Sequence, residues 1–179
     1  MPHQFVNRPR FHAPTRTGSS ARKQFRWESA NAILYMLGGV FFICGSILFF
    51  PAFEQDSNGG AWIFFAGSLL YLVVTGHDAL EVTNYRQQLK GEPTIWDRLE
   101  MWAAACYLVG SLLFAAGSIL FLSWVGRPEV AAWCFILGSL LFVLGAVLAY
   151  VILSVGLEFL MGMGSEYQTA ALTGERYFY

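Results

Sequence analysis

The sequence predicts an all-α protein: an integral membrane four-helix bundle made of two transmembrane hairpins. Four apolar stretches come close to or exceed the ~20 residues that a bilayer-spanning helix needs, and they cover residues 29–53, 57–76, 101–126 and 130–157. The composition agrees, because 56% of the residues are hydrophobic and only 13% are charged, whereas an average soluble chain has about 25% charged residues. An internal repeat then relates the first two stretches to the last two.

Along the chain, the elements follow in a simple order. Residues 1–27 form a basic tail without any acidic residue, predicted to be flexible and cytoplasmic, and residues 28–81 form the first hairpin. A cytoplasmic linker over 82–99 leads to the second hairpin, 100–157, and to a C-terminal cytoplasmic extension, 158–179. With both termini inside, ten of the eleven Lys and Arg lie on the cytoplasmic side, which the positive-inside rule favours.

The two hairpins are copies of one unit. Shifting the sequence by 72 places residues 35–50 on 107–122 with 8 of 16 positions identical. A shift of 71 places residues 61–73 on 132–144 with 7 of 13 identical. Each copy contains two spans, so both copies enter the membrane in the same orientation. We therefore predict parallel repeats, related by an axis near the membrane normal.

Small residues recur every seven positions within the predicted spans. This spacing keeps one helix face towards a partner, and small side chains let helix backbones approach closely in lipid. We expect these residues, rather than bulky ones, to form the centre of the bundle. The predicted helix-packing residues are Gly38, Gly45, Ser46, Gly67, Ser68, Gly110, Gly117, Ser118, Gly138, Ser139 and Gly145. Three cysteines in the spans, Cys44, Cys106 and Cys134, are interpreted as packing residues without a disulfide or a metal.

One polar cluster follows the second apolar stretch. His77 and Glu81 are four residues apart and share a helix face, with Asp78 beside them; such a pair could bind a divalent metal or relay a proton. The alternative is a helix end that emerges into water. A metal would need a third ligand from Glu28, Glu100 or Glu158, and we predict no metal and no cofactor.

A second polar pattern repeats at the start of the odd-numbered spans. Arg26 and Glu28 correspond to Arg98 and Glu100 at the shift of 72. These four residues could pair across the repeat axis as a cytoplasmic clamp, or could form a solvated boundary in which each exposed pair contributes little.

Each predicted hairpin carries the same two strings. Gly-Ser-Ile-Leu-Phe occurs at 45–49 and again at 117–121. Gly-Ser-Leu-Leu occurs at 67–70 and again at 138–141, and each copy follows a Trp, at 62 and at 133. This pattern resembles the YrhK-like bacterial membrane domain, present here as two tandem copies. The resemblance implies a compact membrane hairpin in a bacterial envelope. It implies no activity and no catalytic residue.

The functional interpretation follows from abundant packing signals and little reactive chemistry. The sequence shows no nucleophile–base set, no phosphate-binding loop and no charge at the centre of a span, so we expect no enzymatic activity. We expect a multi-pass protein of the bacterial inner membrane that serves as a scaffold, assembly factor or accessory subunit. Its expected partners are the lipid bilayer and either further copies or a larger membrane complex, and not nucleic acid. The alternative is a small transporter or channel for an apolar or weakly polar substrate, gated near His77.

Overall fold

The computed structural model describes the backbone of residues 18–88, 92 and 94–173. It describes side chains between residues 29 and 155, apart from 54, 85, 88–91 and 93. Four α-helices, α1 (Gly18–Leu48), α2 (Ser57–Gln88), α3 (Ile95–Phe121) and α4 (Pro128–Thr173), and one short 3-10 helix, η2 (Pro51–Asp56), make up the fold. The described backbone contains no strand. The prediction of an all-helical protein is confirmed.

Each α-helix contains a segment long and apolar enough to cross a membrane. These segments are Ser29–Leu48, Ser57–Asn84, Ile95–Phe121 and Pro128–Val155. The first is shorter than the predicted stretch because α1 ends at Leu48, just before Pro51, whose backbone has no N–H to donate to a continuing helix. The prediction of four helices long and apolar enough to span a membrane is therefore confirmed, with altered ends.

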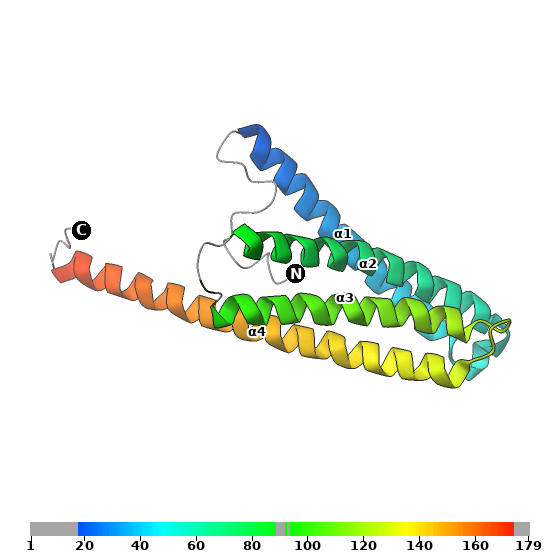
Figure 1. The fold of residues 1–179 in the computed structure, drawn as a ribbon. Helices are drawn as coiled ribbons and strands as arrows, with labels where there is room; N and C mark the ends of the chain where they lie inside the picture. The colour runs from blue at the N-terminus through cyan, green and yellow to red at the C-terminus, as the bar shows by residue number, and fades with distance from the viewer. Residues whose placement is uncertain (1–17, 89–91, 93, 174–179) are drawn as a thin grey trace.

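The helices lie side by side in chain order (Figure 1). α1 packs against α2, α2 against α3 and α3 against α4, whereas the backbones of α1 and α4 do not pack together. We call the end with η2 and residues 122–127 the loop end, and the opposite end, with residues 89–94, the tail end. Figure 1 shows α1 diverging from the other helices towards the tail end, where α4 also extends past them.

Three predicted boundaries differ from the structure. α1 begins at Gly18, so residues 18–27 of the predicted flexible tail have a helical backbone. The predicted linker, 82–99, is mostly helical, because α2 continues to Gln88 and α3 begins at Ile95. There the Thr94 side chain accepts a hydrogen bond from the Asp97 backbone N–H, and the Asp97 carboxylate accepts one from the Thr94 backbone N–H. This capping box fixes the start of α3.

The predicted C-terminal extension is also helical over most of its length. α4 continues without a break to Thr173, although Gly162 and Gly164 fall in this part. Glycine costs only about 1 kcal/mol relative to alanine inside a helix, which a long continuous helix tolerates. Residues 1–17 and 174–179 lie outside the described part of the chain.

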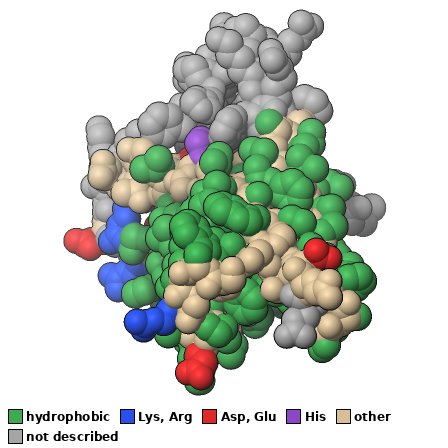
Figure 2. Space-filling model, turned by 90° about the vertical axis from the view of Figure 1, so that its right-hand side faces the viewer, with side chains coloured by type: hydrophobic (Ala, Val, Ile, Leu, Met, Phe, Trp, Pro, Cys, Tyr) green, Lys and Arg blue, Asp and Glu red, His purple; other side chains and the backbone are tan. Residues whose placement is uncertain are grey.

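Large apolar side chains cover the outside of the bundle. Figure 2, seen from the loop end, shows a mostly hydrophobic surface with few charged groups. The equivalent Trp62 and Trp133 are 52% and 63% exposed, and Trp124 at the loop end is 76% exposed. Soluble monomers rarely expose so much contiguous apolar surface, whereas tryptophan is enriched where membrane helices meet the headgroups. This surface fits a lipid environment.

Candidate functional site

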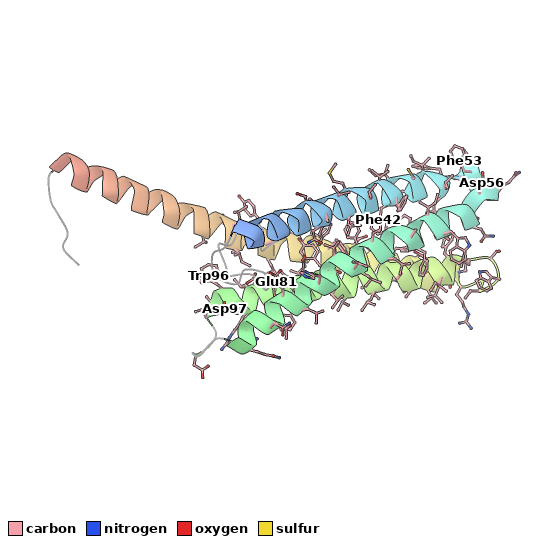
Figure 3. All side chains as sticks on the ribbon, turned by 90° about the horizontal axis from the view of Figure 1, so that it is seen from above. Phe42, Phe53, Asp56, Glu81, Trp96 and Asp97 are labelled. Carbon is pink, nitrogen blue, oxygen red and sulfur yellow. The ribbon has the colours of Figure 1, made fainter. Side chains whose placement is uncertain are left out.

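Half-buried aromatic rings from all four helices meet inside the bundle. Phe42 of α1 lies 5.3 Å from Phe114 of α3, measured between ring centroids, and Phe42 is labelled near the middle of the helices in Figure 3. Three further pairs join the two hairpins: Phe49, just after α1, with Phe121 of α3 (4.6 Å), and, between α2 and α4, Phe64 with Phe135 (5.2 Å) and Tyr71 with Phe142 (5.6 Å). Each of the four pairs joins two positions that are equivalent in the repeat.

The expectation that small residues alone form the centre did not include these rings, although the most deeply buried positions are mostly small, such as Ala61, Ser68 and Ser118. Rings contribute more buried apolar area than glycine or serine, and tilted or edge-on ring pairs add about 0.5–1.5 kcal/mol each. The signal was present in the sequence, because the aromatic residues also recur every seven positions. They occupy 35, 42 and 49, then 64 and 71, then 107, 114 and 121, and finally 135 and 142.

The glycines instead lie where the two helices of each hairpin meet. A Cβ placed on Gly67 would be 3.3 Å from the Gly38 carbonyl oxygen, and one on Gly45 would be 3.2 Å from the Gly60 carbonyl oxygen. In the second hairpin, a Cβ on Gly110 would be 3.1 Å from the Gly138 carbonyl oxygen. The backbones therefore approach too closely for larger side chains. Gly117 and Gly145 are buried as well.

The serines divide into two groups. Ser68 and Ser118 are fully buried, and their hydroxyls donate to the carbonyl oxygens of Phe64 and Phe114, one turn earlier in the same helix. Ser46 and Ser139 are exposed. The cysteines are also distributed differently, with Cys106 buried, Cys134 half-buried and Cys44 exposed, and all three are free thiols.

A polar group is buried inside the bundle towards the tail end. Asp78 of α2 is only 4% exposed, and Asn31 of α1 is 7% exposed. The Asn31 side-chain amide donates to the Asp78 carboxylate at 3.5 Å. Glu100 of α3 is 1% exposed. The interpretation of this region as a helix end in water is therefore wrong for Asp78, which lies between helices while α2 continues ten residues further.

The remaining polar candidates lie at the edge of this group. His77 and Glu81 are half-buried, and Figure 3 places Glu81 at the same end of the bundle as Trp96 and Asp97. Within the described residues, no group of three or more His, Cys, Asp or Glu side chains has the geometry to hold a metal ion. His77, Asp78, Glu81 and Glu100 each have at least one polar or electrostatic partner.

The described residues of the predicted clamp, Arg98 and Glu100, lie in different environments. Arg98 is exposed whereas Glu100, two residues later, is buried, so the two side chains point into different environments. The side chains of Arg26 and Glu28 lie outside the described residues. Sequence reasoning missed the burial of Glu100 and the role of Asn31. The available signal was that Asn31 is the one amide side chain in the span Ser29–Leu48.

The fold defines an all-helical protein with four helices long and apolar enough to cross a membrane, built from two copies of one hairpin. Comparison with protein families matches the YrhK-like protein family twice, over residues 25–82 and 97–152. The chain belongs to this family and carries two tandem copies of its domain, as the resemblance in the sequence predicted. Searches of curated proteins and of solved structures gave no match.

Proposed function

We propose that the protein is a non-enzymatic scaffold, assembly factor or accessory subunit that works through its helix surfaces in the bacterial inner membrane, with both termini cytoplasmic. The observation that carries this proposal is the interior, where rings of all four helices meet beside buried small residues. Phe114, for example, lies 5.3–6.4 Å from the rings of Phe42, Phe64, Phe135 and Phe142. Because rings and small residues occupy the interior along the spans, the outer faces of the helices are the surfaces left for a partner.

The outer faces differ in a way that supports this proposal. Most exposed positions on α4 are large and apolar, such as Leu140, Leu144 and Val147, which suits contact with acyl chains. Ala132, Ser139 and Ala146 are small and also exposed. Small residues on a membrane helix allow close approach of another helix, whereas they gain little from lipid.

Native mass spectrometry of the full chain, extracted in mild detergent and in lipid nanodiscs, tests the proposal. We expect particles heavier than one 20.0 kDa chain, containing either further copies or a stoichiometric partner. Ala146→Leu should deplete these particles, whereas Val147→Leu, on the adjacent lipid-facing position, should leave them unchanged. A lone chain under both conditions contradicts the proposal.

The buried carboxylates favour a second candidate function, a small transporter or channel gated near His77. Ionisable groups inside membrane-spanning segments are costly and usually serve a function, and Asp78 and Glu100 are both nearly fully buried. The substrate is apolar or weakly polar, and uptake of a labelled, weakly polar solute such as glycerol into proteoliposomes tests this function. Flux should fall in His77→Ala, Glu81→Ala and Asp78→Asn but not in Glu129→Gln, an exposed acid at the loop end. Equal flux in all variants contradicts this candidate.

A further inference from the structure

The interface between the two hairpins is a row of small residues. On α2 and α3 these residues recur every seven positions, so each set lies on one face of its helix. All are at most 6% exposed: Ala61, Ser68 and Thr75 on α2, and Ala104, Ser111 and Ser118 on α3. The Thr75 and Ser111 hydroxyl oxygens lie 3.4 Å apart across the interface, and each hydroxyl donates to the carbonyl oxygen four residues earlier in its own helix. This contact shows the register of the two antiparallel helices.

The internal repeat places the same two rows on the outer helices. The shift of 72 carries the α3 row onto Ala32, Gly39 and Ser46 of α1, and the shift of 71 carries the α2 row onto Ala132, Ser139 and Ala146 of α4. Even the local hydrogen bond is repeated, because Ser46 donates to the Phe42 carbonyl oxygen as Ser118 does to that of Phe114. We call these two sets the α1 row and the α4 row.

The outer rows are not buried by another helix of the chain, as the inner rows are. All three residues of the α4 row are exposed, as is Ser46, while Ala32 and Gly39 are half-buried. The backbones of α1 and α4 do not pack together in the chain. Each chain therefore presents both halves of an interface whose assembled form it already contains between α2 and α3.

We propose that a second copy of this chain covers the outer rows, with α4 of one copy packed on α1 of the other as α2 packs on α3. This inference rests on the proposed function, since it names the partner of the helix surfaces. All copies insert into the membrane in one orientation, so α4 and the neighbouring α1 run antiparallel, as α2 and α3 do. Two copies related by a twofold axis form this contact twice and cover all four rows.

A second copy fits better than closure of the chain on itself, because the fold of the single chain leaves the α4 row and Ser46 exposed. At the loop end, α2 is joined to the turn after α3 by two hydrogen bonds between Asn58 and Ser123, at 2.8 and 2.9 Å. The equivalent positions are Glu129 and Pro51, so a contact between the outer rows does not contain this link. Just past the end of α1, the Phe49 ring lies 6.3 Å from the Phe135 ring of α4.

The register predicts which residues meet. Thr75 and Ser111 correspond to Ala146 and Gly39, so Ala146 faces Gly39 of the neighbouring copy. One heptad further along the antiparallel pair, Ser139 faces Ser46 of the neighbouring copy. This second pair is suited to disulfide trapping, because both hydroxyls are exposed in the single chain.

The experiment uses two differently tagged full-length chains co-expressed in membranes, with Cys44, Cys106 and Cys134 replaced by alanine. One chain carries Ser46→Cys and the other Ser139→Cys, and a mild oxidant is added before solubilisation. We expect a disulfide-linked heterodimer that contains both tags and no dimer when either variant is expressed alone. The control pair, Ile47→Cys with Leu140→Cys, has the same depth but faces lipid (45% and 60% exposed) and should give several-fold less dimer.

Each contrary outcome has a distinct meaning. If the double variant Ser46→Cys/Ser139→Cys forms a disulfide only within one chain, then α4 closes on its own α1 and the proposal is wrong. A dimer from Ser46→Cys alone indicates a symmetric α1 contact and also overturns it. If no trapped dimer forms but native mass spectrometry shows a different stoichiometric protein, self-association is wrong while the scaffold function stands. If both experiments show only single chains, the self-association and the scaffold function are both contradicted.

Discussion

Gly110→Ala is the sharpest test of the close packing within a hairpin. A Cβ at Gly110 would lie 2.6 and 2.8 Å from two carbons of the Phe142 ring and 3.1 Å from the Gly138 carbonyl oxygen. The ring cannot readily move away, because it already contacts three other rings, those of Tyr71, Tyr107 and Phe114, at centroid distances of 5.6, 5.4 and 5.3 Å. Overpacking a tight interior costs about 1–3 kcal/mol, and this confinement favours the upper half of that range.

Gly76→Ala is the matched control. Gly76 also lies inside a helix, but nothing is within 4 Å of its Cβ position. Both substitutions gain the same helix propensity, about 1 kcal/mol. The difference between the two variants in the free energy of unfolding therefore gives the cost of overpacking. We expect Gly110→Ala to be less stable than Gly76→Ala by about 2–3 kcal/mol.

The measurement is reversible unfolding by SDS in mixed micelles, followed by tryptophan fluorescence. The unfolding midpoint of Gly110→Ala should fall well below that of Gly76→Ala. Gly38→Ala, at the equivalent position, should behave like Gly110→Ala because its Cβ would overlap the Tyr71 ring. Equal midpoints for all three variants would refute the close approach of the helices.

Three further predictions concern the interior and the loop end. Phe114→Ala should lower the free energy of unfolding by about 3–5 kcal/mol in the same SDS assay, whereas Leu112→Ala, 52% exposed, should cost clearly less; similar losses would argue against a central ring. Asn31→Ala should cost about 1–3 kcal/mol, because it removes a donor from the buried Asp78 carboxylate; an unchanged midpoint would show that the hydrogen bond is dispensable. Asn58→Ala should accelerate amide hydrogen exchange in residues 122–127, since Ser123 loses both bonds to Asn58; unaltered exchange would contradict that role.

The sequence was sufficient for the class, the number of spans and the tandem repeat. Length and hydropathy identify a membrane span without knowledge of its neighbours, and identity at a fixed shift reveals a duplication directly. The seven-residue spacing also identified faces that make contacts. It did not say which face meets which helix, because glycines at 60 and 67 and rings at 64 and 71 recur with the same period on α2.

The polar group at the tail end could not be derived in the same way. Asp78 and Glu100 each lie near the end of an apolar stretch, where a carboxylate is commonly solvated. Their burial depends on α2 continuing to Gln88 and on α3 beginning at Ile95, which places both side chains between helices. Sequence hydropathy averages over such positions, so it does not reveal that Asn31 lies opposite Asp78.

The length of α4 has a mechanical consequence. The segment long and apolar enough to cross a membrane is traced to Val155, where the described side chains end, and the helix continues without a break to Thr173. At 1.5 Å per residue, this continuation is about 27 Å long. A continuous rod of that size passes any tilt of the span to its far end.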